Sequence, residues 1–547
     1  MFKGHPKGLY VAFFANMGER FGFYTMMAIL VMYLQAKYNL AADNAGFIYS
    51  IFYFSIYALA LLGGFIADRT QNYKGVITFG IIIMFVGYVL MTIPGFGLPF
   101  ALFGLFTIAF GNGLFKGNLQ ALVGQMYDDP QYSKLRDTAF SIFYMGINIG
   151  AVFAPNAARY IRSWYLESNG FKYDADLPGL CNQLLSGTLQ NTEKLQELAN
   201  KVTGTLVTDL HLFAQNYINV FSVGYNYAFA IAAFAMLISL LTYILFKKYL
   251  PDRKSITSKS TNEIPQMSKE EEKKRLTALI LVFLVVIFFW MSFHQNGLTM
   301  TYFARDYTVK TVSPFTYIFF NIWSLISFVA AIFGIIYLVK KKSTPLQRGI
   351  GALLFVAGSI ITYLFYSNFA PQNTIEPEIF QQFNPLFVVA LTPLVITIFA
   401  FLRSKDKEPS TPRKIGIGMI LASFGFVIMM IGSFNLVSPA ELMGQPSPDR
   451  VSPYWLISSY FVLTVAELFL SPMGISFVSK VAPPRFQGLM QGGWFAATAL
   501  GNQLLFVGSS MWVKIEIWQV WLIFVVCCLI SAAFIFSIMK RLELATK

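Results

Sequence analysis

The chain has 547 residues, of which 56% are hydrophobic and only 12% are charged, and its formal net charge is +14. A soluble domain carries about a quarter charged residues, so this composition excludes an ordinary soluble protein and indicates one that spans a membrane. The excess of Lys and Arg does not indicate nucleic-acid binding, because these residues lie mainly in short segments between apolar stretches, where they set membrane topology.

Long apolar segments recur along the chain. A helix that crosses a bilayer needs about 20 predominantly apolar residues, and the first such segment follows MFKGHPKGLY without a small-residue cleavage site, so we expect a retained helix rather than a signal peptide. The sequence predicts fourteen spans in all. They cover residues 10–36, 44–67, 75–93, 99–125, 138–160, 222–246, 276–302, 314–339, 347–366, 384–403, 415–436, 453–479, 487–511 and 517–540.

Basic loop segments fall on one side of these spans. KKYLPDRK follows the sixth span, KKKSTPLQR the eighth and RSKDKEPSTPRK the tenth, whereas an opposite loop such as PGFGLP carries no basic residue. Because Lys and Arg favour the cytoplasmic side, we expect both termini and the linker at 247–275 in the cytoplasm. The polar insert at about 161–220 is expected on the other, periplasmic side, with a surface helix within NTEKLQELANKVTGTLVTDL.

The linker at 247–275 divides the chain into two halves. Residues 1–246 contain six predicted spans and residues 276–547 contain eight. Such a division is expected if two helix bundles rock about a central site.

The first span carries ionisable residues at bilayer depth, where a charge costs at least a few kcal/mol and indicates function. In ANMGERFGFYTMMAIL, helical spacing places Asn16, Glu19 or Arg20, Tyr24 and Met27 on one face. Adjacent residues on a helix point in different directions, so we expect Glu19 and Arg20 not to satisfy each other and this face to line a cavity or another helix. The alternative is a self-neutralising pair that only fixes packing.

Two further charges lie in apolar spans without an oppositely charged neighbour nearby. Lys116 lies in GNGLFKGNLQALVGQMY and Glu467 in FVLTVAELFLSPMGISF. A contact between them would neutralise both and join the two halves, and breaking it would free a charge to hold a substrate. We therefore predict a gate pair; the alternative is a static buried pair.

Two pairs of side chains share helix faces that could border one cavity. Trp290 and His294 stand four residues apart, as do Glu467 and Ser471. The pKa of an unperturbed His makes a proton role possible for His294, and the alternative is a hydrogen-bonded packing residue.

Cys181, Cys527 and Cys528 show no metal or disulfide spacing, and we expect them to be packing residues. With three His and no HExxH, CxxC or GxSxG motif, the sequence argues against an enzyme and predicts no metal and no cofactor.

Several motifs in the correct order resemble the proton-dependent oligopeptide transporter family of the major facilitator superfamily. NMGERFGFY resembles the ExxERFxYY element of span one, GGFIADRTQNYKG the loop motif after span two, and FYMGINIGAVFAP the signature of span five. Further likeness lies in FKGNLQALVGQMY, FHQNGLTMTYFA, NPLFVVALTP, AELFLSPMGISFVSKVAPPRFQG and LMQGGWFAATALGN. The resemblance implies an all-α membrane protein with the major facilitator fold, two six-helix bundles plus two extra helices.

The resemblance also implies roles for individual residues. Glu19 and Arg20 would belong to the proton-coupling element, while Glu467 would face the amino group of a peptide and Lys116 its carboxylate. The residues expected to line the peptide cavity are Tyr24, Lys116, Asn148, Trp290, Asn384, Glu467, Ser471 and Trp494.

The sequence departs from the family pattern in chemistry and in layout. The first Glu of ExxER is Asn16, the second Arg of span one is Met27, and the acidic residue of span seven is His294. Because that Arg and that acid pair at the periplasmic gate in the family, we expect this gate to close here by apolar and aromatic packing, tuned by His294. The extra helix pair is expected at about 314–366, after span seven, rather than in the central linker.

We therefore expect a secondary active transporter that imports di- and tripeptides by proton symport through alternating access, with Glu19, Arg20, Glu467 and His294 in proton coupling. The alternative keeps the fold but carries another small zwitterionic or anionic solute, with altered or absent proton coupling. The expected partners are small peptides, protons and the lipid bilayer, and we expect a monomer in a bacterial inner membrane.

Overall fold

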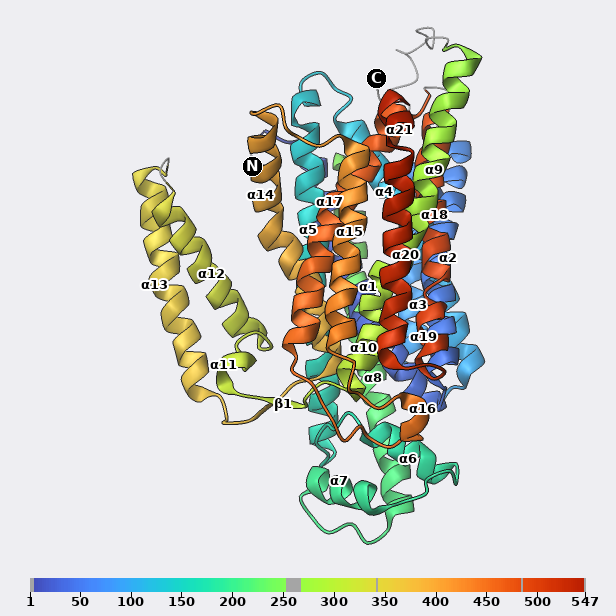
Figure 1. The fold of residues 1–547 in the computed structure, drawn as a ribbon, viewed down its shortest axis with the longest axis vertical. Helices are drawn as coiled ribbons and strands as arrows, with labels where there is room; N and C mark the ends of the chain where they lie inside the picture. Colours follow the sequence, from blue (N-terminus) through green and yellow to red (C-terminus); the bar gives the residue numbers. More distant parts are fainter. Residues whose placement is uncertain (1–3, 252–266, 341–342, 484–485, 546–547) are drawn as a thin grey trace.

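The structure is a computed structural model that describes residues 4–251, 267–340, 343–483 and 486–545. It is a bundle of long α-helices (Figure 1). The long helices of the first half are α1 (Lys7–Tyr38), α2 (Ala42–Thr70), α3 (Tyr73–Thr92), α4 (Leu98–Met126), α5 (Arg136–Ser168) and α8 (Leu210–Phe246). Those of the second half are α9 (Lys269–Phe293), α14 (Phe383–Arg403), α15 (Thr411–Ile431), α17 (Tyr454–Val481), α18 (Gln487–Gln503) and α20 (Ile517–Ser537).

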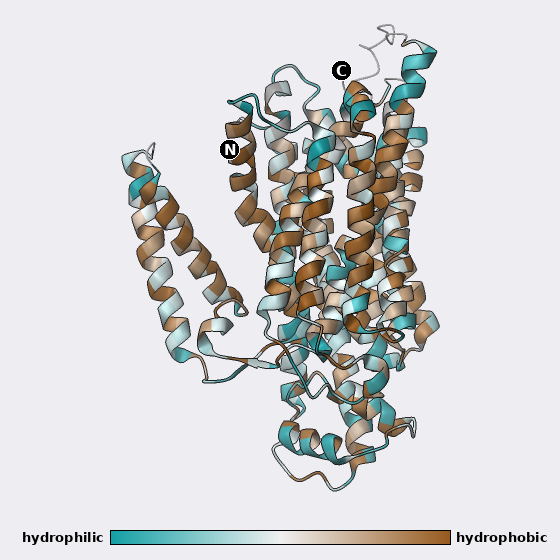
Figure 2. Ribbon diagram, viewed as in Figure 1, coloured by the Kyte–Doolittle hydropathy of each residue, from teal (hydrophilic) through white to brown (hydrophobic). Residues whose placement is uncertain are grey.

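The helices form because apolar segments in a bilayer must satisfy every backbone N–H and C=O internally. Apolar residues run along the helices, whereas polar residues gather at the two ends of the bundle (Figure 2). Asn72 begins α3 by accepting a hydrogen bond from the backbone N–H of Gly75 at 2.9 Å, and left-handed residues end α1 at Asn39 and α2 at Gln71.

Small residues set the close packing of the first half. A Cβ on Gly63 of α2 would collide with the backbone of Gly113 of α4, and one on Gly80 of α3 would lie 2.8 Å from the carbonyl oxygen of Gly111. Glycine at these crossings lets the helix backbones approach each other, as is common in membrane bundles. The packing places α4, which carries Lys116, between α2 and α3.

Twelve helices of the described part of the chain are long and apolar enough to cross a membrane. Two of the expected spans are not among them: α1, whose polar and charged residues lower its mean hydropathy, and α18, which is only 17 residues long. The helical membrane fold is confirmed, and the count of fourteen spans stays a prediction.

The two halves meet along specific helices. On one side α2 packs against α18 and the short α19 (Phe506–Trp512), and on the other α5 packs against α14 and the 3-10 turn η5 (Pro377–Gln382) that precedes it. After α9, the turn η4 (His294–Gly297) leads into α10 (Thr299–Asp306), so His294 lies at a bend in its span.

The end of the bundle opposite the chain termini, here called the outer end, carries the polar insert (Figure 1). The expected insert at 161–220 is shorter in the structure, because α5 continues to Ser168 and α8 begins at Leu210. It contains α6 (Leu177–Leu185) and α7 (Glu193–Thr203), and α7 is the predicted surface helix. Its buried Leu195, Leu198, Ala199 and Val202 form one apolar face.

The extra helix pair, α12 (Ile322–Val339) and α13 (Pro345–Asn368), stands off from the bundle (Figure 1). It leaves through β1 (Thr311–Val312) and the one-turn helix α11 (Pro314–Tyr317) and returns through β2 (Asn373–Thr374), which pairs antiparallel with β1. The pair therefore lies between α10 and α14. Of the predicted linker at 247–275, residues 252–266 lie outside the described part of the chain.

Candidate functional site

The first group of predicted residues lies on α1 and α4. Arg20 donates from Nη2 to Glu19 Oε1 at 2.8 Å and also pairs with Glu19 through Nε. Asn112 of α4 donates to the same Glu19 Oε1 at 2.5 Å. Glu19 is fully buried, and these donors supply the partners that a buried carboxylate requires.

The expectation that Glu19 and Arg20 cannot satisfy each other is wrong. Their Cβ atoms point in different directions from the helix, but the long arginine stem lets the guanidinium turn back onto the neighbouring carboxylate. The pair is not isolated, however, because the bond from Asn112 joins it to α4.

Lys116 lies one helical turn beyond Asn112 on α4. Its Nζ atom is 3.7 Å from the ring centroid of Tyr57 on α2, so the face of the ring stabilises the ammonium group. Within the described ranges, Lys116 forms no ion pair. A half-buried ammonium group that rests on an aromatic ring and has no ion pair among the described residues is suited to bind an anionic ligand.

The second charged group lies on α14 and α17, in the other half. Asn384 donates from Nδ2 to Glu467 Oε2 at 2.9 Å and to Thr464 Oγ1 at 3.1 Å. The predicted contact between Lys116 and Glu467 is therefore wrong for this conformation, because the lysine lies on Tyr57 and the carboxylate on Asn384. Whether the two act as a gate stays a prediction.

Aromatic and polar side chains lie between and around the two charged groups. The ring of Tyr24 lies edge-on to Phe23, which also faces the Arg20 guanidinium, and Tyr57 lies under Lys116. The indole N–H of Trp290 and the hydroxyl of Ser471 are buried and, in the part of the chain that the structure describes, have no hydrogen-bond partner. Because buried polar groups normally have one, these two are available to a polar ligand.

The remaining predicted cavity residues have local roles. Asn148 of α5 donates to the backbone carbonyl of Tyr144 at 3.0 Å. The ring of Trp494 on α18 packs against Gly474 of α17, at a crossing where a Cβ would collide with it. Trp494 thus joins two helices of the second half, and its role in binding stays a prediction.

His294 joins the two halves nearer the outer end. Its Nδ1 lies 2.5 Å from Asn502 Oδ1 and its Nε2 lies 3.2 Å from the hydroxyl of Tyr53 on α2. An amide oxygen only accepts, so Nδ1 carries a proton toward Asn502, while the Tyr53 hydroxyl can either donate to Nε2 or accept from it. Its ring also stacks on Trp290 at 4.7 Å and lies 4.5 Å from Tyr53, and whether this packing closes a gate stays a prediction.

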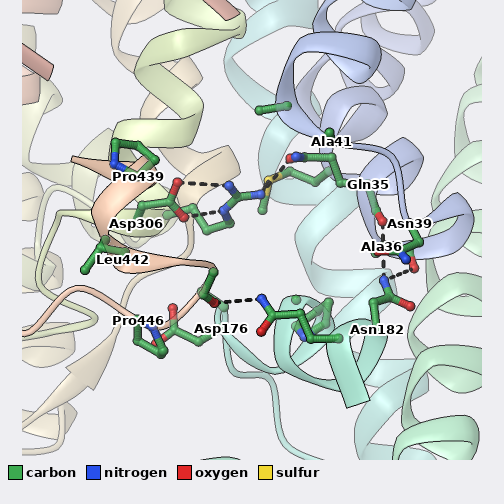
Figure 3. Close-up of a pocket in the computed structure, with 18 of the residues that line it drawn as sticks. Gln35, Ala36, Asn39, Ala41, Asp176, Asn182, Asp306, Pro439, Leu442 and Pro446 are labelled. Carbon is green, nitrogen blue, oxygen red and sulfur yellow. Dashed lines mark hydrogen bonds and ion pairs between the residues drawn. The ribbon is translucent and has the colours of Figure 1, made fainter. Parts of the chain in front are cut away.

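A cavity of about 420 Å³ lies at the outer end between the halves. Figure 3 shows Gln35 and Asn39 of the first half on one side and Asp306, Pro439 and Leu442 of the second on the other. Arg305, in its wall, donates to Gln35 at 2.6 Å and to both oxygens of Asp306 at 2.6 and 2.9 Å, so its guanidinium is already satisfied. None of the predicted substrate residues lines this cavity.

Sequence reasoning missed several residues of this region. Asn112 lies four residues before Lys116, and Tyr53 and Tyr57 lie four apart in IYSIFYFSIYAL, so helical spacing from the predicted residues was an available signal. Asn502 gives no such signal because only the fold brings it to His294. The acidic cluster at Glu376 and Glu378 falls in a loop, where charged residues normally face water.

The sequence model of the POT family matches residues 74–268 and 367–522. An uncharacterized transporter of Bacillus subtilis is 28% identical over 530 residues, which cover 92% of this chain and 87% of that protein. The dipeptide and tripeptide permease A of Cronobacter turicensis is 26% identical over 507 residues, with 90% and 82% covered. The gap in the family match includes the extra helix pair.

Solved structures share the fold over the whole chain. A crystal structure of a peptide transporter POT in complex with sulfate has a TM-score of 0.67 and 21% identity, and covers 100% of this chain and 96% of that one. A POT family transporter in complex with 5-aminolevulinic acid has a TM-score of 0.66 and 19% identity, with 100% and 98% covered.

Proposed function

The chain belongs to the POT family, and from this premise we propose that it is a secondary active transporter that imports di- and tripeptides by proton symport. The observation that carries the proposal is the separation of two unlike charges on the two halves of the bundle. Lys116 lies on Tyr57 and Glu467 on Asn384, and neither neutralises the other. A short peptide is a zwitterion whose carboxylate and amino group match these two charges.

The neighbouring polar groups fit the same ligand. Trp290 Nε1 and Ser471 Oγ, both buried and without a partner among the described residues, supply a donor and a donor or acceptor to a peptide backbone. Because Trp290, like Lys116 and Glu467, lies on a helix that must move when the halves rock, binding and movement involve the same residues.

We assign proton coupling to the carboxylates of Glu19 and Glu467. Glu19 is held by Arg20 and Asn112, and protonation would weaken both interactions and free the guanidinium. Protonation of Glu467 would weaken its hold on a substrate amino group. His294 was also predicted to take part, and its hydrogen bonds to Asn502 and Tyr53 fit the alternative as well, a packing residue between the halves.

A second candidate keeps the fold and changes the cargo. Asn16, Met27 and His294 replace charged residues of the family pattern, and one solved POT transporter holds 5-aminolevulinic acid, a small zwitterion that is not a peptide. This alternative predicts transport of a small zwitterionic or anionic solute with altered or absent proton coupling. In either case the protein is a multi-pass membrane transporter, and we place it as a monomer in a bacterial inner membrane.

The test is uptake of labelled dialanine into proteoliposomes with and without an inward proton gradient. We compare the unmodified chain with Lys116→Ala and Glu467→Ala. Lys194→Ala and Glu197→Ala are matched controls, because these residues form an exposed ion pair at 2.8 Å on α7 of the insert. Gradient-stimulated uptake that is lost only in the first two variants supports peptide symport.

Two other outcomes separate the parts of the proposal. Peptide uptake that ignores the gradient would keep the cargo and contradict the proton coupling. The absence of any dialanine uptake, with the protein monodisperse, would contradict the cargo and favour the second candidate.

A further inference from the structure

A buried cluster of two arginines and two glutamates joins the halves at the outer end. Arg159 and Arg162 belong to α5, and Glu376 and Glu378 lie at the start of η5, more than 200 residues later in the chain. Arg162 and Glu378 are fully buried, and Arg159 and Glu376 are 7% and 6% exposed. None of these four residues is among those placed at the central site.

The contacts of the cluster are specific. Arg162 donates from Nη1 to Glu378 and from Nη2 to Glu376. Arg159 Nη1 lies 3.8 Å from Glu376 Oε1, and the Ser163 hydroxyl donates to the same oxygen at 3.4 Å. Two guanidinium groups thus face two carboxylates, and the cluster is neutral as a whole.

Aromatic side chains of the first half enclose the guanidinium of Arg162. The ring centroid of Tyr173 lies 4.1 Å from Arg162 Cζ and that of Phe221 lies 5.6 Å from it. The Tyr225 hydroxyl donates to Glu378 Oε1 at 3.4 Å. The cluster is therefore enclosed by protein, and each charge depends on its partners in the other half.

Neighbouring contacts hold both sides of the cluster in place. Next to Tyr173, Asp174 pairs at 2.6 Å with Lys310 of the second half. The backbone N–H of Ile375 donates to the carbonyl of Lys310 at 2.9 Å, continuing the pairing of β1 with β2. Lys310 and the two glutamates therefore lie on hydrogen-bonded neighbouring segments, where the extra helix pair leaves and rejoins the bundle.

One turn further toward the middle of the bundle, the same two elements make another contact between the halves. Asn156 of α5 donates to Gln382 of η5 at 2.7 Å, and Asn156 is only 3% exposed. A route from the outer face to the interior between α5 and η5 is closed while these contacts exist.

We propose that the cluster of Arg159, Arg162, Glu376 and Glu378 is the outer gate of this transporter. It holds the exterior closed, and it separates and becomes hydrated when the central site opens outward. The proposal rests on the proposed function, since it assumes alternating access, and it assigns the closing of the exterior to α5 and η5.

Burial of the four charges determines the equilibrium between the closed and the open gate. When the halves separate, all four charged groups become hydrated. The free energy of opening is therefore only the difference between the free energy of the buried network and that of four hydrated ions. When one partner is removed by mutation, the closed state keeps a buried network with one uncompensated charge, whereas in the open state every remaining charge is hydrated. Removal of a single partner should therefore shift the equilibrium toward the open exterior.

The test measures how fast a membrane-impermeant thiol reagent modifies Asn156→Cys, added from the outer side without substrate or gradient. All variants carry this cysteine, and the unmodified chain gives the background of Cys181, Cys527 and Cys528. We add Arg162→Met or Glu378→Gln. The matched control is Arg136→Met, which removes an exposed arginine from an ion pair with Asp128 at the opposite end of α5.

We expect Arg162→Met and Glu378→Gln to raise the rate of modification by about tenfold or more, and Arg136→Met to leave it unchanged. Glu378→Gln preserves shape and serves alone if Arg162→Met is not monodisperse. An unchanged rate in folded Glu378→Gln would overturn the gate. Because the readout needs no substrate, failure of the gate and failure of peptide uptake are distinguishable.

Discussion

At the scale of single residues, burial determines which charges are structural and which are available. Glu19 is enclosed by Arg20 and Asn112, whereas Lys116 rests on the face of Tyr57 and has no ion pair among the described residues. The two cations therefore have different tasks although both lie in the first half. Arg20 neutralises a carboxylate of its own helix, and Lys116 remains available to a ligand.

The bond from Asn112 to Glu19 predicts a coupling defect. In Asn112→Ala, Glu19 loses one donor, so its charged form is less stable and its response to protons changes. We expect gradient-driven uptake of peptide to fall about tenfold while exchange of peptide without a gradient is retained, as for loss of a hydrogen bond to a charged group. Parallel uptake and exchange assays measure the two activities.

Asn118→Ala is the matched control for that variant. Asn118 is also buried on α4, but it donates to the backbone carbonyls of Gly63 and Leu114 at 3.0 and 2.8 Å. It should change stability without changing the ratio of driven uptake to exchange. Equal ratios in the two variants would contradict a coupling role for Glu19.

The hydrogen bonds that hold both ring nitrogens of His294 predict that its titration is not needed for transport. His294→Gln can retain a bond to Asn502 or to Tyr53 and carries no titratable proton. We expect gradient stimulation of uptake to persist, measured across external pH 5 to 8. If stimulation disappears in this variant but not in Tyr53→Phe, His294 is a proton carrier after all.

At the scale of elements, the extra helix pair is peripheral. α13 buries only Gly351 and Gly358, and its partner α12 contacts it along its length. By contrast, α11 and the turn after it belong to the bundle, because Thr316 bonds the Tyr454 hydroxyl at 3.1 Å and Gln382 donates to the carbonyl of Phe319 at 3.0 Å. Residues up to Asn321 therefore pack with the bundle, and the residues after it form the peripheral helix pair.

Removal of α12 and α13 should therefore leave a working transporter. The rings of Tyr317 and Phe369 lie 4.9 Å apart, so a short Gly/Ser linker can replace residues 322–368. We expect the shortened chain to be monodisperse and to take up peptide within about threefold of the full chain, since little packing with the bundle is lost. A chain that folds but does not transport would show that the pair takes part in gating.

The turn between α14 and α15 predicts an acid-sensitive contribution to stability. Hydrogen bonds from Arg403 and from Lys414 lower the pKa of Glu408 to about 2. A depressed pKa stabilises the folded state above the unfolded value of about 4.3, and this contribution is lost as the pH falls toward 2. Glu408→Gln should lower the unfolding temperature in detergent at pH 7 by a few degrees, with a smaller difference at pH 3.

Glu543→Gln is the control for that measurement. Glu543 pairs with Arg413 at 2.8 Å on the same face, but it is more exposed. Its replacement should change the unfolding temperature less. An equal pH dependence for both variants would mean that surface charge in general, and not Glu408, accounts for the effect.

At the scale of the whole molecule, the outer end is closed by many contacts between the halves while Lys116 and Glu467 are apart. Movement about the central site requires the outer contacts to break. Cross-linking Asn156→Cys to Gln382→Cys with a reducible bifunctional thiol reagent should therefore stop uptake, and reduction should restore it. The two single-cysteine variants, treated in the same way, should keep transporting; uptake that continues after complete cross-linking would contradict outer opening at this place.

The sequence predicted the fold class and the family, because apolar length and motifs are properties of short segments, whereas the roles of the intramembrane charges stay predictions. Contacts between distant segments were not predictable in the same way. The sequence places Glu376 and Glu378 in a loop. They are buried against Arg162 because the fold packs this segment beside α5. Rotamers were not predictable either: Arg20 folds back onto Glu19, which helix geometry alone did not indicate.

The short strand pair β1 and β2 has a consequence for the history of the chain. Val312 stands opposite Asn373, so the segment that carries the extra helices leaves and re-enters the fold at neighbouring points. A segment with adjacent ends can be inserted into a gene, or lost from it, without changing the path of any other helix. The extra pair has the form of such a module, and lineages with and without it can share one ancestral transporter core.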